Sequence, residues 1–422
     1  MKDEYLKRII DGELDMALKT FGAVLIEGPK WCGKTMTAEG RAASALYMQD
    51  IDEEDFLFHT MKTKPSVLLE GETPRLIDEW QMFPKIWNGV RFAVDQRGGT
   101  GHFILTGSSV PKDDAGLHTG TGRITRLLMR PMTLFESLES NGCVSLRSLF
   151  NGGEAEGATL LSIEDIAFAL VRGGWPESVG KERNIALKYA RNYVETVTRS
   201  DISRVDDVER NPDRAERLMR SLARNESTPS KLTTIKNDVI GGDPDNTFAD
   251  NTLYSYLNAL RRMFVIEDMP AWSFDKRSNT VMQTSSKRYF IDPSIAAAAL
   301  KISPEGLLRD LRTFGLLFES LCIRDMRVYA QANDGKVYHY RDRNGLEVDA
   351  VIEFYDGRWG AAEVKLGSKG VEEAAKNLMK FKEKVDLEKM GEPSFLMIVT
   401  ATDRAYLRKD GVYIVPIGCL RD

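Results

Sequence analysis

Short apolar runs that end in glycine or polar residues mark the first third of the chain. These runs are Ala23–Ile26, Leu76–Ile77 and Phe103–Leu105. Uninterrupted apolar runs are typical of strands buried on both faces of a parallel sheet. The first run breaks at Gly28–Pro29, and helix-compatible residues continue from Lys34. The pattern therefore predicts a strand, a loop and a helix within an open α/β sheet.

The middle of the chain changes to a helical pattern. Between residues 151 and 225 the predicted helices are interrupted at Gly173, Gly174 and Pro176, and their charges are mixed. We interpret this stretch as a helical lid and connector.

Residues 226–300 combine apolar positions at helical spacing with a strand-like FVIEDM. This order predicts a winged-helix module, whose exposed candidates for DNA contact are Asn258, Arg261 and Arg262. Winged helices also serve as protein docking units, and the local charge is not strongly positive. Both uses stay open.

The last part of the chain contains three β-rich runs separated by Asn344–Gly345 and Asp356–Gly357, which are strong hairpin signals. A meander of three antiparallel strands is the simplest prediction. The apolar helix GLLFESLCI precedes it and the helix VEEAAKNLMKF follows it. Together the patterns predict four parts, comprising residues 1–150, 151–225, 226–300 and 301–422.

Composition narrows the class of protein. At 422 residues the chain is long enough for several domains, and its net charge of −5 gives no overall attraction to nucleic acid. It has no apolar run of eighteen residues and no apolar leader, so we expect a cytoplasmic protein without a membrane segment. The four cysteines lie far apart without a CxxC pair, which indicates reduced thiols.

The first predicted loop carries the phosphate-binding pattern G-x-x-x-x-G-K-[ST]. Its glycines allow successive backbone N–H groups to point at phosphate oxygens. The lysine would reach the β- and γ-phosphates of ATP, and the threonine hydroxyl would bind Mg²⁺. The predicted nucleotide-binding residues of this loop are Gly28, Pro29, Lys30, Trp31, Cys32, Gly33, Lys34 and Thr35.

Two further strand ends supply the rest of a nucleotide site. Asp78 follows the second apolar run as the expected Mg²⁺ partner, and Glu79 is the expected base that orients the attacking water. Thr106 ends the third run as a candidate γ-phosphate sensor. Because ligands bind at the carboxyl ends of parallel strands, the three ends should converge. Of three following arginines, Arg123 is the first choice for an arginine finger or sensor, before Arg126 and Arg130.

The segments GPKWCGKT, LIDEWQ, ILTGSS, TGRITRLLMRPMTLFE and RGGWPES, in this order, resemble the prokaryotic AAA-type ATPases that carry a C-terminal domain of unknown function. The resemblance covers nearly the whole chain. It implies a P-loop, AAA-like αβα core with a helical lid, and it assigns nucleotide roles to Lys34, Thr35, Asp78, Glu79 and Thr106. It implies no biological role.

The predicted meander resembles the core of PD-(D/E)XK nucleases. Glu319 lies on the preceding helix, Asp349 on the middle strand, and Glu363 and Lys365 lie two apart on the third strand. In such sites the carboxylates, here Asp349 and Glu363, hold Mg²⁺, and the lysine helps to orient the nucleophilic water. The same residues also fit a purely structural interpretation, in which Lys365 pairs with a carboxylate across strands on an exposed face of the sheet.

These observations lead to one main hypothesis and two alternatives. The main hypothesis is a Mg²⁺-dependent ATPase that controls a winged-helix and nuclease-like C-terminal half acting on DNA or RNA. The first alternative is a non-cleaving ATP-dependent switch whose C-terminal half docks a partner protein. A small-molecule kinase is weaker, because no acceptor pocket can be recognised. The sequence leaves the oligomeric state open, including a homo-oligomer in which a neighbour supplies the arginine.

Overall fold

The computed structural model describes residues 5–109, 120–241, 248–273 and 286–422. The chain forms two compact units. Unit 1 comprises Met1–Pro131, Asp201–Glu209 and Leu257–Val265, and unit 2 comprises the other residues. The division into four parts stays a prediction.

Unit 1 is built on a five-stranded sheet with the order β2-β3-β4-β1-β5, in which every neighbouring pair is parallel. The three predicted strands are present as β1, β3 and β4. The strands are β1 (Ala23–Glu27), β2 (Ser44–Tyr47), β3 (Arg75–Asp78), β4 (Phe103–Gly107) and β5 (Ile124–Leu128), and the helices are α1 (Ile10–Thr20), α2 (Lys34–Glu39), α3 (Glu54–Thr63) and α4 (Ile86–Arg97).

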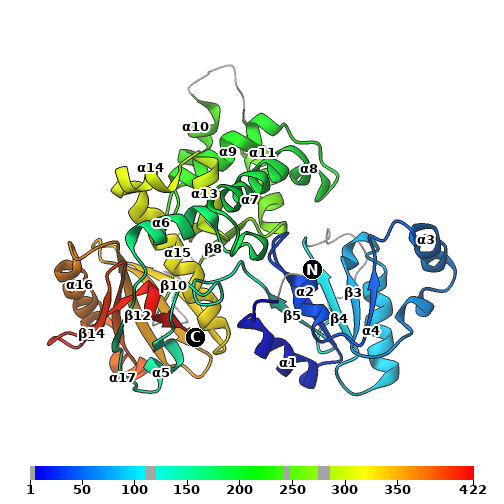
Figure 1. Ribbon diagram of the computed structural model, residues 1–422, viewed down its shortest axis with the longest axis horizontal. Coiled ribbons are helices and arrows are strands. Elements are labelled where there is room, and N and C mark those ends of the chain that lie inside the picture. Colours follow the sequence, from blue (N-terminus) through cyan, green and yellow to red (C-terminus); the bar gives the residue numbers. More distant parts are fainter. Residues whose placement is uncertain (1–4, 110–119, 242–247, 274–285) are drawn as a thin grey trace. The chain divides into compact units, whose positions relative to one another are not determined.

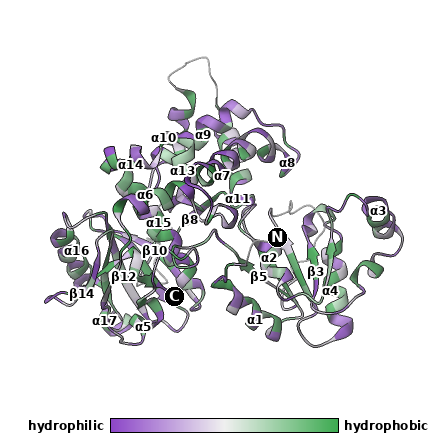
Figure 2. Cartoon of the chain, in the orientation of Figure 1, coloured by the Kyte–Doolittle hydropathy of each residue, from purple (hydrophilic) through white to green (hydrophobic). Residues whose placement is uncertain are grey.

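The sheet of unit 1 is buried on both faces, which explains its continuous apolar runs. Along β1, Ala23 and Leu25 enter one core together with residues of α3 and α4, whereas Val24 and Ile26 enter a second core with residues of α1 and α2. Figure 1 shows α1 and α2 on one side of this sheet and α3 and α4 on the other. Figure 2 shows green, hydrophobic segments among the strands of this sheet. The result is a three-layer αβα arrangement.

Unit 2 contains a seven-stranded mixed sheet with the order β10-β11-β12-β13-β15-β14-β7. The predicted meander is present, because β10, β11 and β12 pair antiparallel, and β12 then pairs parallel with β13. The strands are β7 (Gly157–Ala158), β10 (Gly335–Arg341), β11 (Glu347–Phe354), β12 (Trp359–Lys365), β13 (Leu396–Thr400), β14 (Arg404–Leu407) and β15 (Val412–Pro416).

Two long helices pack on this sheet. The helix α15 (Leu311–Gln331) contacts β10, β11 and β12, and α16 (Val371–Lys384) contacts β11, β12 and β13. In the view of Figure 1 the sheet lies between them. A core of Trp359, Phe381 and surrounding apolar residues joins α16 to the sheet. The shorter α17 (Leu387–Met390) follows α16.

The other helices of the chain lie between β7 and α15 in sequence. Three of them, α9, α10 and α11, are followed by an antiparallel pair of strands, β8 and β9. Residues 242–247 and 274–285 of the predicted winged helix lie outside the described residues. The elements are α6 (Ile163–Arg172), α7 (Arg183–Thr196), α8 (Ile202–Arg204), α9 (Pro212–Arg224), α10 (Leu232–Ile240), α11 (Asp250–Arg262), β8 (Ile266–Met269), β9 (Lys287–Phe290), α13 (Pro293–Ala299) and α14 (Pro304–Arg309).

Residues 132–150 belong to unit 2. The strand β6 (Val144–Ser145) pairs with β16 (Leu420–Arg421) at the end of the chain, and α5 (Leu146–Phe150) follows it. The backbone hydrogen bonds of β6 therefore fix this segment to the C-terminal part.

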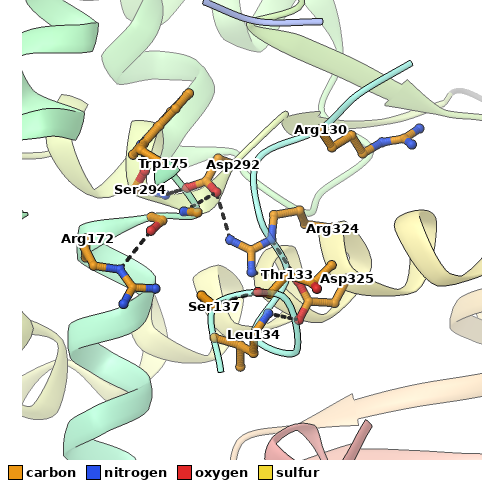
Figure 3. Close-up of polar contacts among 12 residues, drawn as sticks. Arg130, Thr133, Leu134, Ser137, Arg172, Trp175, Asp292, Ser294, Arg324 and Asp325 are labelled. Atoms are coloured by element: carbon orange, nitrogen blue, oxygen red, sulfur yellow. Dashed lines mark hydrogen bonds and ion pairs between the residues drawn. The ribbon is translucent and has the colours of Figure 1, made fainter. Parts of the chain in front are cut away.

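The segment RGGWPES enters a buried polar network within unit 2. Gly174 N donates to Asp292 Oδ2 at 3.0 Å, and Arg324 Nη1 donates to the same oxygen at 2.8 Å. Arg324 also pairs with Asp325, whose second oxygen accepts from Leu134 N at 3.0 Å. Figure 3 shows these residues converging from separate segments. Because every member of this chain of contacts has a partner, the network stabilises a specific packing of unit 2.

No helix among the described residues combines the length and the apolar character needed to cross a membrane. The four cysteines, all within the described ranges, are free. This agrees with the expected reduced thiols.

Candidate functional sites

The predicted phosphate loop connects β1 to the six-residue helix α2. Gly33 immediately precedes α2 with φ 99°, a left-handed conformation that favours glycine. Lys34 is buried, and its Nζ donates to Gly28 O at 3.0 Å and to Pro29 O at 2.7 Å. The loop therefore curls around the lysine ammonium.

Close contacts with β5 fix the shape of the loop. A Cβ atom on Gly28 would lie 2.1 Å from Met129 O, so only glycine fits there. Cys32 Sγ donates to the same carbonyl at 3.5 Å. Arg8, which the sequence analysis missed, is buried and donates to Cys32 O at 2.7 Å and to Arg130 O at 2.8 Å. The arginine thereby ties the loop to the end of β5.

Lys30 and Trp31 are two further residues of the predicted loop. Lys30 Nζ lies 2.8 Å from Asp201 Oδ1, and both residues belong to unit 1. The Trp31 side chain is 44% exposed, and its backbone has φ 66°. The Trp31 side chain is therefore partly exposed to solvent.

Asp78 lies at the centre of the site. Its Oδ1 accepts hydrogen bonds from Thr35 Oγ1 at 2.8 Å and from Thr106 Oγ1 at 2.6 Å. Its other oxygen, Oδ2, is buried and has no hydrogen-bond partner among the described atoms. Burial raises the pKa of Asp78, and the hydrogen bonds from Thr106 and Thr35 work against that rise. The structure thus brings together three residues that sequence analysis placed on separate strand ends.

Strand order explains the role of Thr106 in this contact. The strand that carries it, β4, lies between β1 and β3. The threonine hydroxyl therefore lies beside the end of β3, where it donates to the Asp78 oxygen that also accepts from Thr35. It also accepts from Glu79 N at 3.1 Å.

Glu79 follows Asp78 in a left-handed conformation with φ 53°. Its Oε2 accepts from Ser108 Oγ at 3.0 Å and from Gln81 Nε2. Gln81 also donates to Ser108 at 3.3 Å. Gln81 was missed by the sequence analysis, although its place two residues after Glu79 is a usable signal. Together Gln81 and Ser108 hold the Glu79 carboxylate in a fixed orientation.

The structure does not place Arg123 at the phosphate loop of its own chain. Its carbonyl accepts from Ala23 N, the first residue of β1, and its side chain pairs with Asp95 at 2.8 Å. Arg123 thus lies at the amino ends of the strands, about 16 Å from their carboxyl ends at 3.3 Å per residue. Arg126 pairs with Glu27 at 3.0 Å, and Arg130 follows the carboxyl end of β5. Of the three, Arg130 lies on the loop side.

The C-terminal candidates also converge. Lys365 Nζ lies 2.7 Å from Glu363 Oε2 and 3.8 Å from Asp349 Oδ2. Asp349 Oδ2 also accepts from Val364 N at 2.8 Å. Asp349 and Glu363 come from neighbouring antiparallel strands, which is why the meander brings them together.

Lys287, which the sequence analysis missed, connects these strands to Glu319 on α15. Its Nζ lies 3.1 Å from Glu319 Oε1 and 3.6 Å from Asp349 Oδ1. Tyr289 from the same strand donates to Glu319 Oε1 at 2.8 Å. We call Lys287, Glu319, Asp349, Glu363 and Lys365 the carboxylate–lysine cluster.

Burial and mutual repulsion control the charges in this cluster. Burial, with the charge of Asp349, raises the pKa of Glu319 to about 7 and that of Glu363 to about 8. Burial alone would lower the pKa of Lys287, but the charges of Glu319 and Asp349 outweigh it and leave the pKa raised. Across residues 5–109, 120–241, 248–273 and 286–422, no three His, Cys, Asp or Glu side chains are grouped so as to hold a metal ion. The Mg²⁺ site at Asp349 and Glu363 stays a prediction.

The candidates for DNA contact are partly engaged within the protein. Arg261 Nη1 donates to Asn258 Oδ1 at 3.2 Å, and Arg262 lies 4.0 Å from Asp206. DNA contact by these residues also stays a prediction.

Comparisons with known proteins divide the chain into three matched regions. Residues 20–138 match an AAA domain, and residues 163–306 and 314–420 match two domains of unknown function, DUF8612 and DUF4143. No curated protein matches the chain. One matching solved structure is the Walker-type ATPase PABY2304 of Pyrococcus abyssi, with 14% identity, a TM-score of 0.43, and coverage of 71% of this chain and 97% of that chain.

The AAA match covers the phosphate loop, Asp78 and Thr106, which the structure brings to one edge of a parallel sheet. Residues 20–138 thus combine a sequence match to an AAA domain with a phosphate-loop arrangement on a parallel sheet.

Proposed function

We propose that the chain hydrolyses ATP with Mg²⁺ at the edge of the unit 1 sheet. In this proposal the Lys34 ammonium and the backbone of Gly28–Gly33 bind the phosphates. Glu79 takes the proton of the attacking water, while Gln81 and Ser108 orient its carboxylate. Thr106 orients Asp78 and senses the γ-phosphate. The proposal depends chiefly on the contacts of Asp78.

The residues around Asp78 fit a hard divalent cation. Asp78 Oδ2 is a buried oxygen without a partner among the described atoms, and the Thr35 hydroxyl lies 2.8 Å from the other oxygen of the same carboxylate. A buried, unpaired carboxylate oxygen is costly unless a cation satisfies it. Thr35 and Asp78 would hold Mg²⁺, the latter through water. Bound Mg²⁺ would neutralise charge that develops on the phosphates. Phosphate release by wild-type protein, with and without Mg²⁺, tests this function.

We further propose that the nucleotide state controls the C-terminal half, and that this half binds DNA or RNA. The order of two helices, α10 and α11, and an antiparallel pair of strands, β8 and β9, supports a winged-helix assignment for residues 226–300. The four-part division of the chain is part of this proposal. A non-cleaving switch that docks a partner protein is the competing function.

Cleavage of nucleic acid is a second candidate function, and the convergence of Glu319, Asp349, Glu363 and Lys365 favours it. We expect slow cleavage of labelled single- or double-stranded nucleic acid that falls at least tenfold in Asp349→Ala and in Glu363→Ala, since each removes a carboxylate of the proposed centre. Glu372→Ala is the matched control, because this acid is exposed on α16.

The cleavage assay should include Mg²⁺ or Mn²⁺, with and without ATP. Activity that persists in both cluster variants would assign the cleavage to a contaminant or another site. An absence of cleavage under every condition would favour the non-cleaving switch.

A further inference from the structure

Lys287 occupies the interior of the carboxylate–lysine cluster. It is the first residue of β9, outside the meander that carries Asp349, Glu363 and Lys365. Its side chain is only 4% exposed, compared with 31% for Lys365. The two lysines therefore differ in position. Lys365 lies at the rim, where solvent reaches it, and Lys287 lies inside.

The Lys287 ammonium interacts with two carboxylates of the cluster, those of Glu319 and Asp349. It lies within 4 Å of Glu319 Oε1 and of Asp349 Oδ1, and these residues come from α15 and β11. Tyr289 donates to the same Glu319 oxygen. A cation between carboxylates of two different elements is the arrangement that a bound metal ion would otherwise provide.

Two further carboxylate oxygens of the cluster already have partners. Asp349 Oδ2 accepts from Val364 N and lies near Lys365, while Glu363 Oε2 accepts from Lys365. With every group ionised, the three carboxylates and two ammonium groups sum to −1, against −3 for the carboxylates alone. The raised pKa values of Glu319 and Glu363 reduce the negative charge further near neutral pH. A divalent cation beside Lys287 would also be repelled by its charge.

We propose that Lys287 is the resident counter-ion of this cluster, and that a divalent metal ion binds there only when the Lys287 ammonium is displaced. One consequence rests on the proposed cleavage function. Because Lys287 keeps a divalent metal ion out of the nuclease-like centre, it restrains cleavage there. It is a positioning residue, because its contacts are with the carboxylates. Without Lys287, Glu319 and Asp349 lose the ammonium group that pairs with both of them.

The test is Mn²⁺ binding by the full chain, measured from the free-ion signal in electron paramagnetic resonance without nucleotide. All proteins in this comparison carry Asp78→Asn, so that Mn²⁺ binding at the nucleotide site is equally weak in each of them. Adding Lys287→Met, of similar length but uncharged, should create one site that binds Mn²⁺ at least tenfold more tightly than the parent. Further addition of Asp349→Asn should remove that gain. Lys287→Arg, which keeps the charge, should bind like the parent.

Thermal unfolding gives a second readout if Lys287→Met is unstable, since Mn²⁺ should raise its Tm and leave that of the parent nearly unchanged. Equal Mn²⁺ affinity in the parent and Lys287→Met, or a gain that survives Asp349→Asn, would overturn the proposal. Cleavage is not part of this measurement, so the result stands apart from whether the protein is a nuclease.

Discussion

Replacing Lys34 with alanine is expected to weaken ATP binding by about 100-fold or more. The ammonium is buried inside the loop, where it donates to Gly28 O and Pro29 O, and in our account it turns to the β- and γ-phosphates. A hydrogen bond between charged groups contributes about 1.5–3 kcal/mol, and its loss leaves phosphate charge without a partner. Titration of the variant with a fluorescent ATP analogue measures the effect.

Lys19→Ala is the matched control, because Lys19 is an exposed lysine at the end of α1. It should bind ATP like the wild type. If Lys34→Ala binds and hydrolyses ATP at the wild-type level, the loop is not the nucleotide site.

Replacing Glu79 with glutamine should lower the rate of hydrolysis by about 10² to 10⁴ while ATP binding stays near the wild-type level. The amide keeps the size of the side chain and an oxygen that can accept from Ser108 and Gln81, but it cannot take a proton from water. Single-turnover hydrolysis and equilibrium binding, measured on the same preparation, separate the two effects.

Glu70→Gln provides the comparison, because Glu70 is an exposed acid that precedes β3. Near-normal turnover in Glu79→Gln would show that another group orients the water. A parallel loss of binding would instead indicate that Glu79 supports the shape of the site.

The unit 1 site could be predicted from sequence because each part is local. One part is a buried strand with its glycine loop. The other two are strands that end near Asp78–Glu79 and near Thr106, and each part occupies a few consecutive residues. The parallel arrangement then forces their carboxyl ends to one edge. What remained hidden was the strand order, which places β4 between the other two and allows Thr106 to hold Asp78.

Contacts between distant segments account for what the sequence pattern missed. Lys287 meets Glu319 and Asp349 only after β9, α15 and β11 have packed, so no spacing rule indicates it. The strand β6 joins unit 2 because it pairs with the last strand of the chain, a contact between distant segments. Arg123 was chosen because it follows the sequence TGTG, residues 119–122, whereas strand direction puts it at the amino ends of the strands.

The segment RGGWPES illustrates a motif whose use is structural. A Cβ atom on Gly174 would lie 2.1 Å from Met132 O, and Trp175 Nε1 donates to Ser294 at 3.1 Å. Gly174 thus allows two backbone segments to approach closely, and Trp175 takes part in a buried polar network. A sequence pattern alone cannot distinguish such packing from a ligand contact.

The central claim is that Asp78, held by Thr35 and Thr106, organises Mg²⁺-dependent hydrolysis of ATP. The most direct test is phosphate release from ATP by the purified full chain, compared between wild type with Mg²⁺, wild type with EDTA, and Asp78→Asn with Mg²⁺. The account predicts sustained release in the first sample and a fall of at least 100-fold in the other two, since a metal-organised charge is lost in both. Release that continues unchanged in EDTA or in Asp78→Asn, or no release by the wild type, would contradict it.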